Sequence, residues 1–273
     1  MIITNSSNVI HFVNRPISRA EQLLFSPPHT MKYAMNNVVK IADKYYYVKR
    51  CTDRTLLNEL IGSCYSSIIG LDAVDYLIGI DNNNSNCLYA LSEVFFRDDY
   101  DYTTVFDYCL MKPDDSKLYS RGLSKYYVVE TGVLDFFNSP QLTDNVLKMS
   151  AIDLKTGQID RKNYNVIIRR GIDGIELEKV YDFGLSYQGV DSFHDETYYY
   201  NPFLIVRRNT ISLWGLVHRY PQLYDSFSIL RDVPVYDVIK GIEKRFDIKV
   251  EDTTMKDYIE QDTEFTGILR KVK

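Results

Sequence analysis

The fold is decided by the stretch DRKNYN at residues 160–165, together with DFG at residues 182–184. Four residues separate Asp160 from Asn165, and Asp182 follows after a predicted pair of short strands. Phosphoryl transfer from ATP needs an aspartate that accepts the proton of the attacking hydroxyl. It also needs an asparagine and a second aspartate that hold magnesium on the phosphates. This order and spacing predict Asp160 as the catalytic base and Asn165 and Asp182 as metal ligands.

Asp153 competes with Asp160 for the role of base. The triplet DLK at residues 153–155 resembles the catalytic loop of many eukaryotic-type kinases, but the partner position is Gln158. Glutamine is a poorer magnesium ligand than asparagine. We therefore favour Asp160, and we interpret Asp153 as the end of a helix that precedes the catalytic loop.

Lys49 and Glu59 are the predicted upstream partners of these motifs. A kinase needs a lysine on a rigid strand to neutralise phosphate oxygens, and a helix carboxylate to orient that lysine. Lys49 ends the strand-like run YYYVK, and Glu59 lies on the next predicted helix. The alternative is a solvated lysine and a surface glutamate, and the downstream motifs favour the catalytic interpretation. The side chain of Arg50 should point to the opposite face of the strand.

A glycine-rich phosphate loop is excluded, because the first glycine of the chain is Gly62. A Walker A motif is excluded for the same reason. The segment before the first predicted hairpin could approach phosphates instead, and Lys32 is its candidate basic residue. A proline-rigidified surface loop is the alternative interpretation of this segment.

Hydrophobic periodicity predicts a β-β-α-β-β order in the N-terminal part of the chain. The predicted elements are a hairpin at 38–49, a helix at 53–69, and strands at 74–80 and 87–96. Downstream, we predict helices at 128–137, 141–152, 209–219, 233–246 and 254–270, with short strands at 163–170 and 176–181. The fold class is therefore predicted as α+β, a two-lobe protein-kinase-like fold. Residues 1–97 would form a small antiparallel-sheet N-lobe with one helix, and residues 98–273 a mainly helical C-lobe with the catalytic and metal-binding loops.

Composition restricts the partners of the chain. Its apolar content is 45%, its charged content is 25%, and its net charge is −5. An acidic chain argues against direct nucleic-acid binding. We see neither a membrane span nor a signal peptide, so we expect a cytoplasmic protein without a membrane partner. The four cysteines show no metal-binding spacing and are expected to be reduced.

Taken together, these motifs resemble the HipA-like kinases, a bacterial branch of the protein-kinase-like fold. The resemblance rests on YYVK at 46–49, NE at 58–59, GQIDR at 157–161 with Asn165, and YDFGLS at 181–186. It extends over roughly residues 30–270. The family's glycine-containing phosphate loop is absent, and Lys162 stands where the family often has histidine. The extra N-terminal subdomain of the full-length toxins is not expected either, because the hairpin begins near residue 38.

The resemblance implies that Lys49 contacts the ATP phosphates and that the backbone around Glu93 and Phe95 binds adenine. It implies a HipA-like serine/threonine protein kinase that uses ATP and Mg²⁺, with a protein substrate and an antitoxin-like regulator as partners. Two alternatives stay open, a small-molecule phosphotransferase and a pseudokinase that acts as a binding or scaffold module. The missing glycines favour the pseudokinase, whereas the intact Lys49, Asp160, Asn165 and Asp182 oppose it.

Overall fold

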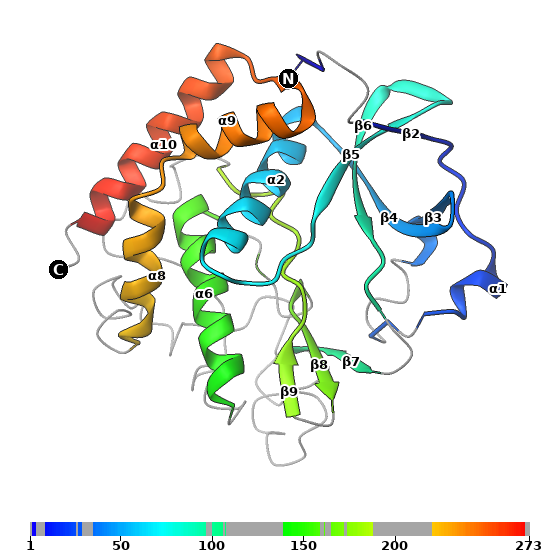
Figure 1. The fold of residues 1–273 in the computed structure, drawn as a ribbon, viewed down its shortest axis with the longest axis horizontal. Helices are drawn as coiled ribbons and strands as arrows, with labels where there is room; N and C mark the ends of the chain where they lie inside the picture. The colour runs from blue at the N-terminus through cyan, green and yellow to red at the C-terminus, as the bar shows by residue number, and fades with distance from the viewer. Residues whose placement is uncertain are drawn as a thin grey trace, which may run out of the picture.

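The structure is a computed structural model that describes most of the chain. The described residues are 2–3, 9–25, 27–28, 35–96, 100–105, 107, 139–158, 161, 165–171, 174–187 and 220–270. Figure 1 shows a sheet on one side of the molecule, a group of helices on the other, and helix α2 between them.

The N-lobe contains a five-stranded sheet in the order β2-β5-β6-β4-β3. The predicted β-β-α-β-β unit is confirmed and forms most of it. Its elements are β3 (Val38–Ile41), β4 (Lys44–Cys51), α2 (Asp53–Ile68), β5 (Tyr76–Asp81) and β6 (Asn84–Glu93). These four strands pair antiparallel, and the turn between β3 and β4 lies at residues 42–43.

Strand β2 (Ile10–Phe12) was not predicted from the sequence. It pairs parallel with β5 and forms one edge of the sheet. The chain then crosses to the other edge, where the short helix α1 (Arg19–Gln22) follows Pro16, which bridges to Val39. The segment is too short for its hydrophobic pattern to reveal a strand, so its position depends on tertiary pairing.

Helix α2 begins and ends with the predicted signals. The hydroxyl of Thr52 accepts a hydrogen bond from the backbone N–H of Thr55 at 3.1 Å, and Gly70 follows the helix with a φ of 67°. A side-chain cap of this kind satisfies one of the free N–H groups at a helix start. The apolar face of α2 is buried between the sheet and helices α6 and α9, so a single core joins the two lobes.

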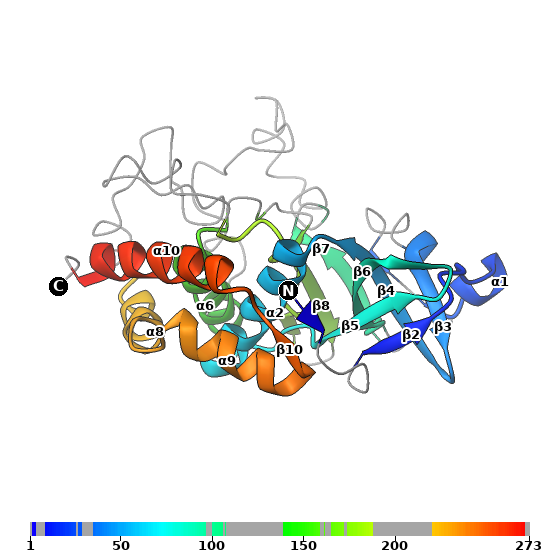
Figure 2. The same cartoon turned by 90° about the horizontal axis from the view of Figure 1, so that it is seen from above.

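The C-lobe is built mainly from helices. In the described part of the chain these are α6 (Pro140–Thr156), α8 (Gln222–Arg231), α9 (Val235–Phe246) and α10 (Asp252–Arg270). Helix α8 was not predicted, although its buried Leu223, Phe227 and Leu230 have helical spacing. Figure 2 shows α10 running along this lobe from the side of β10 (Ile248–Lys249). Strand β1 (Ile2–Ile3) pairs with β10, so the N-terminal residues lie against the C-terminal part of the chain.

A three-stranded sheet connects the lobes, in the order β7-β8-β9. Strands β8 (Ile167–Gly171) and β9 (Gly174–Leu177) form the predicted hairpin, and β7 (Asp101–Thr104) adds an unpredicted third strand. Beyond β9, Val180 pairs with the segment leading into β5: the N–H of Val74 donates to its carbonyl at 2.9 Å. This contact places the residues that follow, 181–184, at the edge of the N-lobe.

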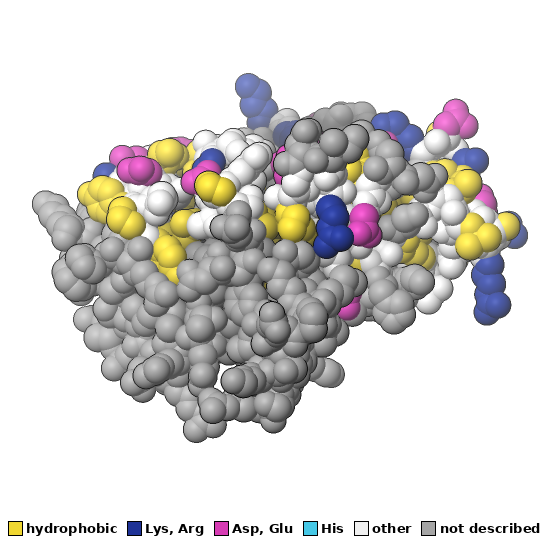
Figure 3. All heavy atoms as spheres, turned by 90° about the horizontal axis from the view of Figure 1, so that it is seen from below, with side chains coloured by type: hydrophobic (Ala, Val, Ile, Leu, Met, Phe, Trp, Pro, Cys, Tyr) yellow, Lys and Arg dark blue, Asp and Glu magenta, His cyan; other side chains and the backbone are white. Residues whose placement is uncertain are grey.

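The predicted helices at 128–137 and 209–219 lie outside the described residues. No helix in the described part of the chain is long and apolar enough to cross a membrane. On the face shown in Figure 3, the described lysine and arginine side chains are scattered among acidic and apolar ones.

Candidate active site

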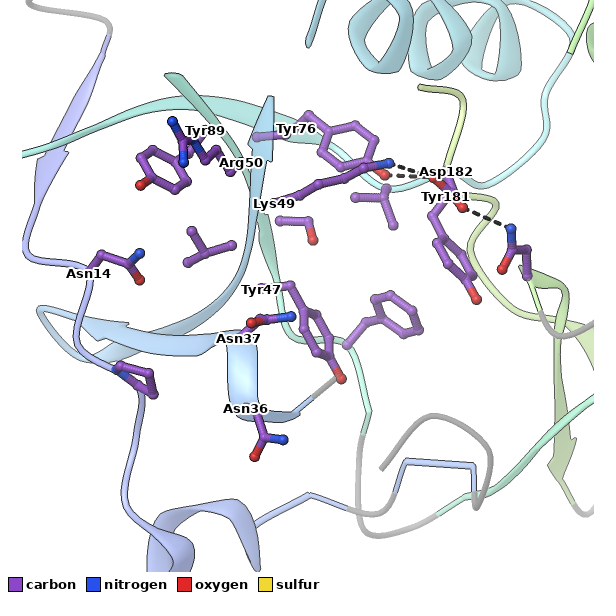
Figure 4. Close-up of a pocket in the computed structure, with 17 residues that line it drawn as sticks. Asn14, Asn36, Asn37, Tyr47, Lys49, Arg50, Tyr76, Tyr89, Tyr181 and Asp182 are labelled. Atoms are coloured by element: carbon purple, nitrogen blue, oxygen red, sulfur yellow. Dashed lines mark hydrogen bonds and ion pairs between the residues drawn. The ribbon is translucent and has the colours of Figure 1, made fainter. Parts of the chain in front are cut away.

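A cavity of about 840 Å³ lies where the N-lobe sheet meets the segment after β9. It is lined by Lys49, Tyr76, Asn165 and Asp182, by other residues of β4 and β6, and by residues of the segments on either side of α1, namely Asn14, Pro16, Asn36 and Asn37. Its volume is within the usual range for small-molecule sites. Figure 4 shows Lys49 pointing across this cavity toward Asp182, while Arg50 leaves the opposite side of β4, as predicted.

Lys49 lies opposite Ala90 of the central strand β6, so its backbone is held on a rigid strand. The Nζ atom contacts Oε1 of Glu59 at 2.6 Å and Oδ1 of Asp182 at 2.5 Å. Burial alone would lower the pKa of Lys49, but the two carboxylates outweigh that effect and raise it. The lysine is therefore charged at neutral pH and available to a polyanionic ligand.

Glu59 is fully buried on α2 and accepts hydrogen bonds with both oxygens. One comes from Lys49, and the other from the backbone N–H of Phe183 to Oε2 at 2.8 Å. Burial raises the pKa of Glu59, whereas Lys49 and the Phe183 amide oppose that rise. Because both oxygens act as acceptors, we treat this carboxyl as ionised.

Asp182 occupies a left-handed backbone conformation, with a φ of 63°. Aspartate is among the few side chains that tolerate this region. Its N–H donates to the Tyr76 hydroxyl at 3.2 Å, and its carbonyl accepts from Nε2 of Gln158 at 2.5 Å. Its Oδ2 accepts from Nδ2 of Asn165 at 2.8 Å. Both carboxylate oxygens therefore meet predicted site residues.

Phe183 is fully buried beneath α2. A Cβ atom added to Gly62 would lie 2.1 Å from Cγ of the Phe183 ring, so only glycine fits at this position of the helix. The Arg161 guanidinium lies 4.9 Å from the ring centroid. Phe183 thus anchors the motif in the core while the adjacent Asp182 lines the cavity.

Asp153 lies in the last turns of α6, as predicted. It is fully buried, and its Oδ1 and Oδ2 accept from the guanidinium of Arg161 at 2.9–3.3 Å. Arg161 also donates to the carbonyl of Tyr181 at 2.5 Å. The Asp153–Arg161 pair thus holds the backbone just before Asp182 from within the core, and neither residue lines the cavity.

Of the two residues predicted to bind adenine, Glu93 and Phe95, only Phe95 lines the cavity. The Glu93 side chain is exposed and pairs with Lys44 at 2.8 Å, and Glu93 is not among the residues that line the cavity. Phe95 lines the cavity, and its carbonyl accepts from the Tyr102 hydroxyl at 3.4 Å. Two other predicted site residues, Asp160 and Lys32, lie outside the described residues.

The structure therefore brings Lys49, Glu59, Asn165 and Asp182 together, although Lys49 and Asp182 are 133 residues apart in the chain. Sequence reasoning missed the contacts of Tyr76 and the supporting role of Gln158. Nothing in the pattern of β5 distinguishes Tyr76 from other strand tyrosines. Gln158 was considered only as a metal ligand, and it instead fixes the backbone of Asp182.

The donor types at Asp182 and Asn165 suit magnesium. Carboxylate and amide oxygens are ligands that Mg²⁺ accepts, and the ion usually combines one or two protein ligands with phosphates and water. The amide nitrogen of Asn165 faces Asp182, so the amide must turn to present its oxygen. Among the described residues, no group of three or more histidine, cysteine or acidic side chains forms a metal site on its own.

No protein-family model and no curated protein matches the chain. Among solved structures, the chain is similar to the Helicobacter pylori proinflammatory kinase CtkA. The TM-score is 0.61 and the identity 14%, over 86% of this chain and 91% of that one. It is also similar to HipA of Shewanella oneidensis MR-1, solved with HipB and operator DNA, with a TM-score of 0.55 and 12% identity. That match covers 86% of this chain and 62% of the HipA chain. The chain therefore has the two-lobe, kinase-like fold of HipA and CtkA.

Proposed function

We propose that this protein is a kinase that uses ATP and Mg²⁺ to phosphorylate a serine or threonine hydroxyl of another protein. The observation that carries the proposal is the contact of Lys49 with both Glu59 and Asp182 in the wall of the cavity. A lysine oriented by a helix carboxylate, beside a metal-binding aspartate, is what phosphoryl transfer requires. The fold shared with the kinase CtkA and with HipA supports the same interpretation.

Each described residue has a distinct task in this proposal. Lys49 neutralises phosphate oxygens, and Glu59 keeps the lysine in place through their 2.6 Å contact. Asp182 and Asn165 would hold Mg²⁺, which neutralises charge on the phosphates when it is bound. Lys49 would turn to the phosphates of a bound nucleotide, and the carboxylate of Asp182, now paired with Lys49, would be free to hold the metal.

Two tasks are assigned to residues outside the described part of the chain. Asp160 would accept the proton of the attacking hydroxyl, and Lys32 would approach the phosphates. The backbone around Glu93 and Phe95 would bind adenine. Catalysis in this scheme comes from positioning and charge neutralisation rather than from a covalent intermediate.

The partners follow from the same interpretation. We infer a protein substrate and a cytoplasmic location, and the HipA structure with HipB motivates an antitoxin-like regulator as a second partner. A small-molecule acceptor and a pseudokinase are the alternatives. A pseudokinase is the weaker one, because Lys49 contacts both Glu59 and Asp182.

The test is incubation of the purified protein with γ-labelled ATP and Mg²⁺, alone and with cell lysate. Label on protein supports the proposal, label on small molecules supports the alternative acceptor, and no label supports the pseudokinase. Lys49→Met should reduce labelling about 10²–10³-fold, the usual loss for a transition-state charge contact. Asp160→Asn should remove transfer while ATP still binds.

Lys240→Met is the matched control for Lys49→Met. Lys240 also pairs with a glutamate, Glu243 at 2.7 Å, but it lies on the exposed side of α9. Its replacement should leave labelling unchanged. Equal labelling by wild type and Lys49→Met would contradict the proposal.

A further inference from the structure

Helix α2 is tied at Asn58 both to the segment after Asp182 and to the C-terminal helix α10. Asn58 is fully buried, and its Nδ2 donates to the carbonyls of Gly184 at 3.0 Å and Ser186 at 2.5 Å. Its Oδ1 accepts from the hydroxyl of Tyr258, on α10, at 2.5 Å. One side chain therefore connects three parts of the fold that are far apart in sequence.

A second contact, one turn earlier on α2, reinforces the first. Arg54 donates from Nη2 to the carbonyl of Tyr187 at 2.5 Å. Its guanidinium lies 5.5 Å from the ring centroid of Tyr258 and 3.8 Å from Oδ2 of Asp257. Positions four apart share one face of a helix, so α10 and the segment at 184–187 meet the same face of α2.

Helix α2 also leads directly to the candidate active site. Glu59, the residue after Asn58, contacts Lys49 and accepts from the N–H of Phe183. Residues 183–187 are thus held by α2 at Glu59, Asn58 and Arg54. Because Asp182 immediately precedes this segment, a shift of the segment moves the carboxylate that contacts Lys49.

We propose that Tyr258 and Asn58 are positioning residues of the active site: α10 orients Asn58, and Asn58 fixes residues 183–187 and with them Asp182. The C-terminal helix is then part of the catalytic apparatus, although it lines no part of the cavity. The catalytic consequence rests on the proposed kinase function. The anchoring itself does not, because it concerns only contacts within the protein.

Tyr258→Phe is the decisive variant, since it removes one hydroxyl and keeps the ring that packs on Tyr187 at 4.9 Å. The amide protons of Ser186 and Tyr187 donate to backbone carbonyls, so hydrogen–deuterium exchange reports their protection. We expect exchange at 183–187 to become about tenfold faster, as for a destabilisation of about 1.4 kcal/mol. Exchange in β5 and β6 should not change.

Ser66→Ala is the matched control. Ser66 is also a buried polar residue of α2, but its hydroxyl donates only to the carbonyl of Gly62, at 2.8 Å. Its loss should leave exchange at 183–187 unchanged. Asn58→Ala is a second variant and should have a larger effect than Tyr258→Phe. If Asn58→Ala does not fold, the proposal is tested by comparing the exchange rates at 183–187 in Tyr258→Phe and Ser66→Ala.

The catalytic part is tested by kcat and KM for ATP. A positioning role predicts that Tyr258→Phe lowers kcat about tenfold with little change in KM, and that the thermal midpoint stays close to that of Ser66→Ala. Unchanged exchange at 183–187, or unchanged kcat in an active enzyme, would overturn the proposal. A wild-type protein that transfers no phosphate contradicts the proposed function instead, and exchange alone then supports or overturns the anchoring by α10.

Discussion

Replacing Asp153 with asparagine should destabilise the protein strongly without acting on the chemistry itself. Asp153 and Arg161 are both buried, with side-chain exposures of 0% and 1%, and their charged groups meet at 2.9 Å. The asparagine keeps the volume of the side chain but removes its charge. The guanidinium of Arg161 is then left in the core without its counter-charge.

The expected magnitude follows from this burial. Removing one partner of a buried ion pair costs about 3–5 kcal/mol, because an uncompensated charge stays in the protein. The free energy of unfolding of an ordinary domain is about 5–15 kcal/mol, so this loss is a large fraction of it. Arg161 also donates to the carbonyl of Tyr181 and lies on the Phe183 ring, so part of the loss should appear as mobility of the Asp182 segment.

Urea unfolding of the purified variants measures the effect. Asp144→Asn is the matched control, because Asp144 lies on the same helix and pairs with Lys148 at 2.9 Å but is 46% exposed. An exposed pair of this spacing is worth about 0.3–0.5 kcal/mol. The double variant Asp153→Leu/Arg161→Met should recover much of the stability, since apolar replacement of a whole buried pair is often neutral.

One result would refute this reasoning. If Asp153→Asn unfolds at the wild-type urea concentration but loses phosphate transfer, Asp153 acts in catalysis. Retained transfer in Asp160→Asn would then reverse the assignment of the base.

Three further expectations follow from the site. Gly62→Ala should destabilise the protein by about 1–3 kcal/mol, measured by thermal unfolding, because the new methyl group overlaps the Phe183 ring; unchanged stability would contradict the packing. Asn165→Ala should raise the Mg²⁺ concentration needed for half-maximal nucleotide use by about tenfold or more, with the thermal midpoint retained; a large loss of stability without nucleotide would indicate a structural role instead. Burial raises the pKa of the Cys51 thiol to about 11, so little thiolate exists at neutral pH. Its alkylation by iodoacetamide, followed by mass spectrometry, should therefore accelerate about tenfold per pH unit from pH 7 to 10; a plateau near pH 8.5 would show an ordinary thiol.

Sequence alone predicted the elements whose signals are local. The β3–β4 hairpin, the capped helix α2 and the hairpin of β8 and β9 each carry a periodicity, a cap or a turn within a short stretch. Such signals depend on hydrogen bonds between near neighbours and on burial of one face. The kinase-like order of the motifs could also be recognised in the sequence, because the spacing of Asp160, Asn165 and Asp182 reflects the chemistry they would perform.

Tertiary structure decided which charged residues meet. Asp153 and Asp160 carry the same functional group, and only the fold shows that Asp153 is enclosed with Arg161 in the core. In the same way, Asn58 and Tyr258 are 200 residues apart, and no periodicity relates them. Periodicity states which face of an element is buried, but not which element covers it. Packing supplies that information, because the partner of a buried polar group is chosen by the geometry of the whole core.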